Sequence, residues 1–151
     1  MQAIDETPKT VKQSGKLIYS VEALLAASPE TVWQKITTPE ELLRWDSMLM
    51  EFEGEIKEGG KIKLRSKMSP KQVFKLNIPE FVPNLKMVWS SSMGPLFKGV
   101  RTYQLQPKDG GTYFSMKEEF SGWLLPIMKK ALPDCDVLFG TYIKDLKNEL
   151  I

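Results

Sequence analysis

Histidine is absent from this chain of 151 residues, and cysteine occurs once, at Cys135. Without histidine, the chain lacks the commonest metal ligand and the side chain whose ordinary pKa lies nearest to neutral pH. Zinc sites built on imidazole, serine triads and proton shuttles based on histidine are therefore excluded. A single cysteine also excludes an internal disulfide and thiolate metal clusters, so we expect no metal, no cofactor and an inert, buried thiol at Cys135.

The chain has neither a large excess of one sign of charge nor a long apolar run. The chain has 21 basic and 19 acidic residues, a net charge of +2, without long blocks of either sign. Because a phosphate backbone requires a basic footprint, nucleic acid is not an expected partner. No segment approaches the roughly 20 apolar residues that cross a bilayer, and the first residues lack the apolar core of a signal peptide. We therefore expect a cytoplasmic protein with no integral membrane association.

The hydrophobic content of 42% is enough for one domain with a sizeable core, and the length is too short for two. Residues 1–15 are mostly polar, which predicts a flexible N-terminal tail ahead of a single domain over residues 16–151. The sequence does not specify the oligomeric state, and a monomer and a homodimer stay equally open.

A strand and two short helices are predicted over residues 17–45. Every second residue from Leu17 to Leu25 is apolar, which places five side chains on one sheet face. Ser28 precedes Pro29 in the pattern of a helix N-cap followed by a first-turn proline. Thr38 repeats this device, and Glu41 stands where it would complete a capping box. The first helix should therefore end near Thr37, where the second begins.

Six further strands and a long helix follow. Alternating apolar residues and Gly, Pro or Asn turns predict hairpins over residues 50–67, 72–89 and 97–121. Asp134 is a predicted N-cap, and apolar residues then recur at steps of three and four up to Leu150. A strongly twisted sheet of seven antiparallel strands curls, so we expect the last helix to lie across its concave side and to enclose a pocket.

The last hairpin predicts a charge pair inside this pocket. If Pro107 faces Thr112, paired residue numbers sum to 219, and Arg101 then lies opposite Glu118. The neighbours on the same face are mostly apolar, so this face should be the concave one. The alternative is a slipped register or a bulge, which would leave an exposed pair worth at most ~1 kcal/mol. A buried pair would suit a ligand carboxylate at Arg101, and its cation should lower the pKa of Glu118.

Five motifs in sequence order resemble the START-like superfamily, the helix-grip group also called SRPBCC. These are ASPETVWQKITTPEELLRWD, EGEIKEGG, IPEFVPNLKMVW, QLQPKDGGT and IKDLKNEL, at residues 27–46, 53–60, 78–89, 104–112 and 143–150. The group includes the polyketide cyclase/dehydrase and lipid-transport family. The resemblance implies an α+β helix-grip fold: a seven-stranded curved antiparallel sheet around a long C-terminal helix, with two short helices after the first strand. It also implies a deep cavity for hydrophobic or amphipathic small molecules.

The superfamily holds carriers, receptors, enzymes and chaperone activators, so several functions stay open. The favoured hypothesis is binding or transport of a small hydrophobic or amphipathic ligand. The alternative is a cyclase- or dehydratase-like enzyme acting on a polyketide-like substrate, with Glu118, Tyr103 and Asp46 as its catalytic candidates. A chaperone-activating role has no specific signature here. The predicted ligand-binding residues are Arg101, Glu118, Tyr103, Trp45, Phe74, Leu76, Met87, Trp89, Phe114, Met116, Leu138 and Tyr142.

An apolar segment, Trp123 to Met128, precedes the last helix and contains Pro126. The pattern favours a helix that packs against the domain. A lid over the pocket and a membrane-contacting patch are the alternatives.

Overall fold

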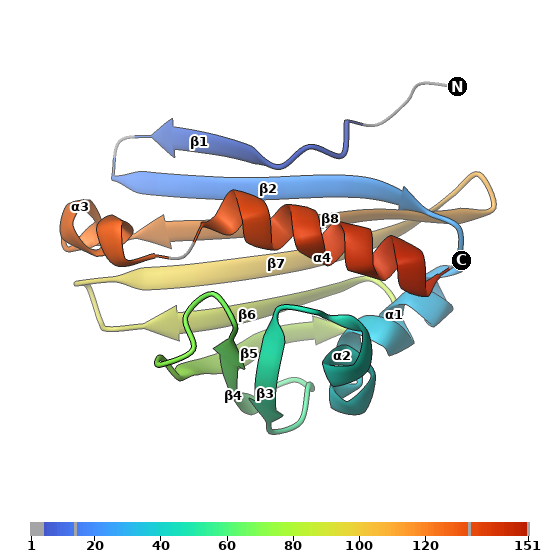
Figure 1. Cartoon of the computed structure of the whole chain (residues 1–151), viewed down its shortest axis with the longest axis horizontal. Coiled ribbons are helices and arrows are strands. Elements are labelled where there is room, and N and C mark those ends of the chain that lie inside the picture. The colour runs from blue at the N-terminus through green and yellow to red at the C-terminus, as the bar shows by residue number, and fades with distance from the viewer. Residues whose placement is uncertain (1–4, 14, 133, 151) are drawn as a thin grey trace.

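A curved antiparallel sheet with a long helix across one face forms the body of the protein (Figure 1). The computed structural model describes residues 5–13, 15–132 and 134–150. The described strands are β1 (Lys9–Gln13), β2 (Lys16–Leu25), β3 (Leu49–Glu53), β4 (Lys61–Ser66), β5 (Phe74–Val82), β6 (Lys86–Ser92), β7 (Lys98–Lys108) and β8 (Gly111–Ser121). The helices are α1 (Pro29–Thr37), α2 (Pro39–Trp45), α3 (Leu125–Met128) and α4 (Cys135–Glu149), and a 3-10 turn covers Lys129–Ala131.

The sheet has one strand more than the sequence predicts. Its order is β1-β2-β8-β7-β6-β5-β4-β3, eight strands within the described residues rather than seven. The added strand is β1, which pairs with β2 at the edge of the sheet and lies in the segment predicted to be a flexible tail. All five of its residues are exposed, so no buried apolar pattern marks it in the sequence. Residues 1–4 and 14 of the predicted tail lie outside the described residues.

The two short helices follow the predicted boundaries, although only one has the predicted cap. Ser28 accepts a hydrogen bond from the backbone N–H of Thr31 at 3.2 Å and so caps α1. The side chain of Thr38 makes no cap bond at the start of α2, and the predicted capping box is wrong. Glu41 instead binds the side chains of Lys35 and Arg44, because two cations within reach outcompete a backbone amide.

Helix α4 begins as predicted, since the carboxylate of Asp134 accepts a bond from the N–H of Val137 at 3.2 Å. One long edge of α4 lies beside the N-terminal segment. The hydroxyl of Thr10 on β1 donates to Asp136 at 2.9 Å, and Lys147 forms an ion pair with Glu6 at 2.6 Å. The N-terminal segment is therefore attached to both ends of the last helix.

The C-terminal half of α4 is also attached on its other side. The Asp145 carboxylate accepts hydrogen bonds from the backbone N–H and the hydroxyl of Ser47, at 2.9 and 2.6 Å. Arg44 on α2 binds the Glu149 carboxylate through two nitrogens. These contacts hold the end of α4 against α2 and the loop that follows it.

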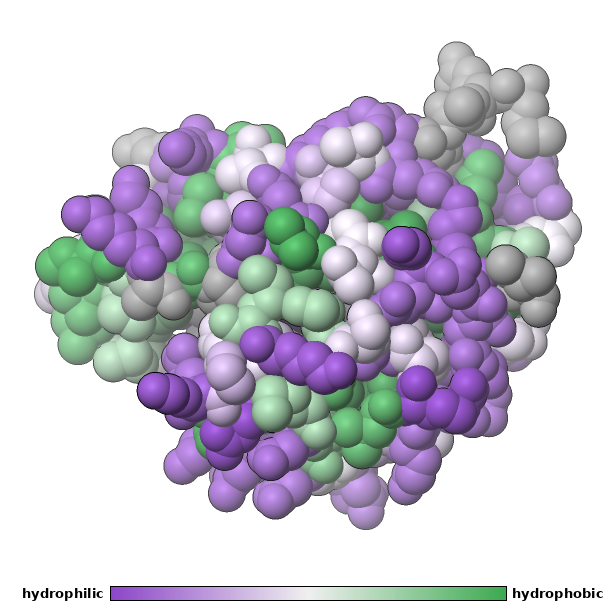
Figure 2. Space-filling view, viewed as in Figure 1, coloured by the Kyte–Doolittle hydropathy of each residue, from purple (hydrophilic) through white to green (hydrophobic). Residues whose placement is uncertain are grey.

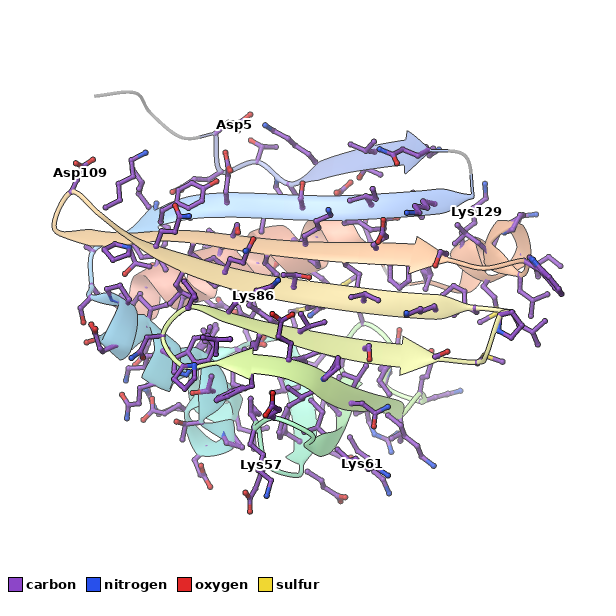
Figure 3. All side chains as sticks on the ribbon, turned by 180° about the vertical axis from the view of Figure 1, so that it is seen from behind. Asp5, Lys57, Lys61, Lys86, Asp109 and Lys129 are labelled. Carbon is purple, nitrogen blue, oxygen red and sulfur yellow. The ribbon has the colours of Figure 1, made fainter. Side chains whose placement is uncertain are left out.

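The main core lies between the concave face of the sheet and the helices. Its fully buried members include Ile36, Leu105, Phe114 and Leu146. A smaller cluster of Leu17, Phe97, Phe120, Leu125 and Cys135 fills the end of the sheet next to α3. The opposite face of the sheet carries side chains into solvent and is not covered by any described helix (Figure 3). The concave side is therefore the place to look for a site.

Only part of the segment Trp123–Met128 packs as predicted. Leu125 is buried in the smaller cluster, whereas Trp123 and Ile127 are 78% and 69% exposed. The expectation of a plain packing helix is therefore met at Leu125 and fails at Trp123 and Ile127. None of the helices in the described chain has the length and hydrophobicity needed to span a membrane.

Candidate functional site

A cavity of about 380 Å³ lies between the concave face of the sheet and α4. Strands β3 to β8 supply one wall, the first turns of α4 supply the other, and Leu42, Asp46 and Met48 close one side. Most of the lining side chains are apolar. The polar lining residues are Asp46, Arg101, Tyr103, Glu118 and Tyr142, together with Ser66, Gln72, Lys75, Ser91 and Ser92.

The register of β7 and β8 places Arg101 and Glu118 side by side in this cavity. The observed pairs run from Lys98 opposite Ser121 to Lys108 opposite Gly111, with the predicted sum of 219 throughout. Arg101 Nη2 donates to Glu118 Oε1 at 3.1 Å, and the two side chains are 26% and 13% exposed. Both line the cavity, so their residual exposure is to its interior space. The predicted register is confirmed, and the alternative of a slipped hairpin is wrong.

Helix α4 covers the cation of this pair. The guanidinium carbon of Arg101 lies 5.2 Å from the centroid of the Phe139 ring, in cation–π geometry. The negative face of the ring and the Glu118 carboxylate both stabilise the positive charge. Burial opposes the charge, but Glu118 and Tyr103 outweigh it, so the pKa of Arg101 lies above its ordinary value. Arg101 is therefore a permanent cation in the cavity.

Glu118 behaves differently from the sequence-based expectation. Burial raises the pKa of Glu118, and the neighbouring Arg101 offsets this only in part. Arg101 lowers the pKa of Glu118 as expected, but the loss of hydration outweighs the attraction of one cation, so the pKa of Glu118 lies above its ordinary value. The pair contains a carboxyl group that holds its proton more tightly than an exposed glutamate does.

Asp46 is a second cavity carboxylate with a raised pKa. It follows α2 directly, and its Oδ1 accepts a hydrogen bond from the Met48 N–H at 3.0 Å. Burial is the largest cause of the raised pKa of Asp46, and the charge of Asp145 adds to it. The hydrogen bond from Met48 and the charge of Arg101 act in the opposite direction but do not cancel the effect of burial.

The variant Asp46→Asn is expected to gain stability relative to the wild type as pH rises from about 4 to 7. A carboxyl with a raised pKa binds its proton more tightly in the folded state. The stabilising contribution of Asp46 in the wild type is therefore present below the unfolded pKa and is lost as pH rises through the folded pKa. The amide retains an acceptor for Met48 and does not titrate. Urea unfolding of both proteins at several pH values measures this difference.

Glu149→Gln serves as the control of opposite sign. Hydrogen bonds from Arg44 lower the pKa of Glu149, so its stabilising contribution is present above the unfolded pKa and is lost as pH falls. As pH rises, the stability of the wild type relative to Asp46→Asn should therefore fall, whereas its stability relative to Glu149→Gln should rise. Parallel slopes would show that burial does not control the titration of Asp46.

Two tyrosines complete the polar part of the cavity. Tyr103 on β7 and Tyr142 on α4 are both buried, with ring centroids 6.4 Å apart. Burial raises the pKa of Tyr103, and it raises the pKa of Tyr142 well above the ordinary value. Both phenols therefore stay neutral and offer O–H donors rather than phenolates.

Most of the predicted site residues come together around the cavity. Nine of the twelve predicted ligand-binding residues line it: Arg101, Glu118, Tyr103, Phe74, Leu76, Trp89, Met116, Leu138 and Tyr142. Asp46, predicted as a catalytic candidate, also lines it. Three predicted residues, Trp45, Met87 and Phe114, do not.

These three residues fill the solid end of the interior. Trp45 donates from Nε1 to the carbonyl of Lys35 at 2.9 Å and packs edge-on against Tyr142. Phe114 stacks on Tyr142 with an interplanar angle of 17°. Met87 is fully buried, and its sulfur accepts a bond from Trp89 Nε1 at 3.3 Å. The concave side is thus packed at the end near α1 and hollow at the end near α3.

Sequence reasoning missed much of the hollow end. Phe97, Gly99, Phe120, Met128, Leu132, Cys135 and Phe139 all line the cavity and were not predicted as ligand contacts. The register of β7 and β8 could have identified two of these lining residues, since it puts Gly99 on the same face as Arg101 and opposite Phe120. A Cβ at Gly99 would lie 3.2 Å from the Phe120 ring, so a residue without a side chain lets this ring lie against the strand.

Cys135 lies at this end of the cavity. Its thiol is buried, and burial raises its pKa to about 12. The predicted inert thiol is consistent with this value, because the thiolate is the reactive form. Within the described part of the chain, no group of three His, Cys, Asp or Glu side chains could hold a metal ion.

A curved antiparallel sheet closed by a C-terminal helix over a cavity defines a helix-grip protein. The family described as polyketide cyclase / dehydrase and lipid transport matches residues 17–134, and the chain belongs to this family. No curated protein matches the chain significantly.

Solved structures of the same fold are similar over most of the chain. A protein from Rhodobacter sphaeroides is 20% identical, with a TM-score of 0.70, covering 95% of this chain and 97% of that one. CalU16 from Micromonospora echinospora is 15% identical, with a TM-score of 0.65 and coverage of 98% and 88%. The Aha1 dimer from Colwellia psychrerythraea is 20% identical, with a TM-score of 0.65 and coverage of 87% and 93%. These likenesses show the fold and confirm its predicted class.

Proposed function

We propose that the protein binds or transports a small amphipathic molecule whose apolar body fills the cavity and whose polar end meets Arg101. The observation that carries the proposal is an apolar cavity with one ion pair in its wall. Its volume of about 380 Å³ lies within the range of ligand pockets, toward the small end. A molecule with a medium-length hydrocarbon body fits this space.

The apolar body would lie against the side chains of β5, β8 and α4. Phe74 and Leu76 on β5, Met116 on β8 and Leu138 on α4 all face the cavity. Burying a hydrocarbon there is favourable by roughly 25 cal/mol per Å² of apolar surface. Such walls recognise shape and hydrophobicity rather than one chemical identity, so they would accept many different apolar ligand bodies.

The polar end of the ligand would be recognised by the pair of Arg101 and Glu118. The attraction within a buried ion pair roughly offsets the desolvation of its two charges, so fold stability alone is a weak reason to keep one. Glu118 binds only one of the two Nη groups of Arg101 at hydrogen-bond distance. The remaining N–H groups of the guanidinium suit a ligand carboxylate, which can accept two parallel bonds.

Native mass spectrometry of the purified protein tests this proposal. We expect a mass above that of the chain alone, and extraction should release an amphipathic molecule bearing a carboxylate or another polar end. A chain that carries nothing, and that also fails to take up any member of a panel of fatty acids and alcohols, would contradict the proposal.

A cyclase- or dehydratase-like enzyme is the second candidate. The observation in its favour is that Glu118 and Asp46 both line the cavity with raised pKa values, next to the neutral phenol of Tyr103. A raised pKa brings a carboxyl group closer to the range in which it can transfer a proton to or from a substrate at neutral pH. A bound polyketide-like molecule that is recovered chemically altered after incubation would favour catalysis, whereas unchanged recovery favours binding.

The proposed carrier is a single domain over residues 16–151 that acts in the cytoplasm as a monomer or homodimer. The proposal requires neither a metal nor a cofactor, since the ion pair and the apolar walls provide all the recognition it needs.

A further inference from the structure

Exposed apolar side chains gather at the end of the molecule that carries α3. Met93 and Leu96, in the turn between β6 and β7, lie beside Trp123 and Ile127, and all four are exposed. We call these four residues the apical patch. Figure 2 shows hydrophobic residues collected over α3 at this end of the molecule. Trp123 is the most exposed of the large apolar residues in the described chain, at 78%.

The apical patch has a fixed backbone. The N–H of Leu124 donates to the carbonyl of Leu96 at 2.8 Å, which ties α3 to the turn between β6 and β7. Leu125 is buried with Phe97 and Phe120 in the smaller core cluster. The segment therefore points Leu125 inward and holds Trp123 and Ile127 outward. An apolar surface held in this way indicates a contact with something outside the chain.

The charged residues within the two segments that carry the apical patch are all positive. Lys98, Lys129 and Lys130 are exposed beside it, and residues 93–98 and 121–132 contain no acidic residue. Lys129 lies at the same end of the molecule in the view from behind (Figure 3). Apolar and aromatic side chains flanked by lysines are the composition that binds the interface of an anionic bilayer.

The apical patch also adjoins the hollow end of the cavity. Met93 lines the cavity as well as belonging to the patch, and its neighbours Phe97, Met128 and Leu132 line the cavity too. The loop between β4 and β5 also carries exposed Lys67 and Lys71 beside the lining residues Gln72 and Val73. A surface that binds the apical patch would therefore lie next to residues that line this end of the cavity.

We propose that the apical patch docks on the surface of a bilayer containing anionic lipids. Trp123 and Ile127 enter the boundary between headgroups and acyl chains, and the lysines contact lipid phosphates and carboxylates. A second copy of this chain is a poorer occupant, because a two-fold contact through this patch brings its lysines against their own copies. The proposal rests on the surface alone and does not depend on what the cavity holds.

Sedimentation with vesicles tests the docking. The wild type should bind vesicles of phosphatidylcholine and phosphatidylserine, and Trp123→Ser/Ile127→Ser should bind at least tenfold more weakly. Leu85→Ser is the matched control, since Leu85 is 51% exposed in the turn at the other end of β6. This control should bind like the wild type. Because neither Trp123 nor Ile127 lines the cavity, the double variant should keep its affinity for a ligand in solution.

The lysines provide an independent test. Lys129→Gln/Lys130→Gln should lose about fivefold in affinity per lysine, the factor that corresponds to about 1 kcal/mol each. Its affinity should also depend less on salt than that of the wild type. A wild type that does not sediment with anionic vesicles at low salt would overturn the proposal. A wild-type dimer that Trp123→Ser/Ile127→Ser converts to monomer would also overturn it, in favour of self-association.

Discussion

Replacing Arg101 by methionine is expected to lower the free energy of unfolding by about 3 kcal/mol at neutral pH. The variant leaves Glu118 in the cavity wall without its cation, and removing one partner of a buried pair costs about 3–5 kcal/mol. We take the lower end because the pair faces a cavity rather than close-packed side chains. Urea unfolding monitored by tryptophan fluorescence measures the change.

The double variant Arg101→Met/Glu118→Met separates this explanation from simple loss of volume. It removes both charges, so most of the lost stability should return. The loss in the single variant should also shrink as pH falls, since a carboxyl with a raised pKa takes up its proton first in the folded state. An equal loss in the single and double variants at every pH would contradict the assigned role of the pair.

Binding of a carboxylate ligand should depend on Arg101 even more visibly. We expect Arg101→Met to bind decanoate about 100-fold more weakly than the wild type, and decanol with nearly unchanged affinity. A hydrogen bond to a charged group is worth about 1.5–3 kcal/mol, and about 2.7 kcal/mol corresponds to a factor of 100. Titration calorimetry with the two ligands measures both affinities.

Lys86→Met is the matched control for the ligand experiment. Lys86 lies on β6 and pairs with Glu80, away from the residues that line the cavity, so its loss should change neither affinity (Figure 3). If Arg101→Met is too unstable to titrate, the double variant with Glu118→Met carries the same comparison. Equal affinity for decanoate with and without Arg101 would remove this residue from the binding site.

Local and periodic signals explain which parts of the fold could be predicted. The register of β7 and β8 follows from a period of two and one turn, so the contact of Arg101 with Glu118 was accessible from the sequence. Strand β1 was not, because its backbone pairs with β2 while its side chains stay in solvent. An edge strand of this kind leaves no pattern to detect.

The sequence could predict which residues lie on the concave face, but not which of them border the cavity. Alternation places Tyr103, Phe114 and Met87 on the concave face alike, yet only Tyr103 borders the cavity. Which side chains fill space and which border it depends on how α4 lies across the sheet, and a strand pattern does not specify this. The raised pKa of Glu118 was missed for a related reason, since the cost of burial depends on three-dimensional enclosure.

The attachments of α4 are unevenly distributed along its length, and this has a consequence for how a guest passes in and out. Asp145 and Glu149 tie the C-terminal turns to α2 and its loop, while Lys147 ties them to Glu6. Among the described contacts, the first turns have Asp136 bound to Thr10 along one side. The first turns, which stand over the hollow end next to α3, are otherwise held, within the described chain, by the packing of Cys135 and Phe139 rather than by polar bonds. We therefore expect this end of the helix to move when a guest enters or leaves the cavity.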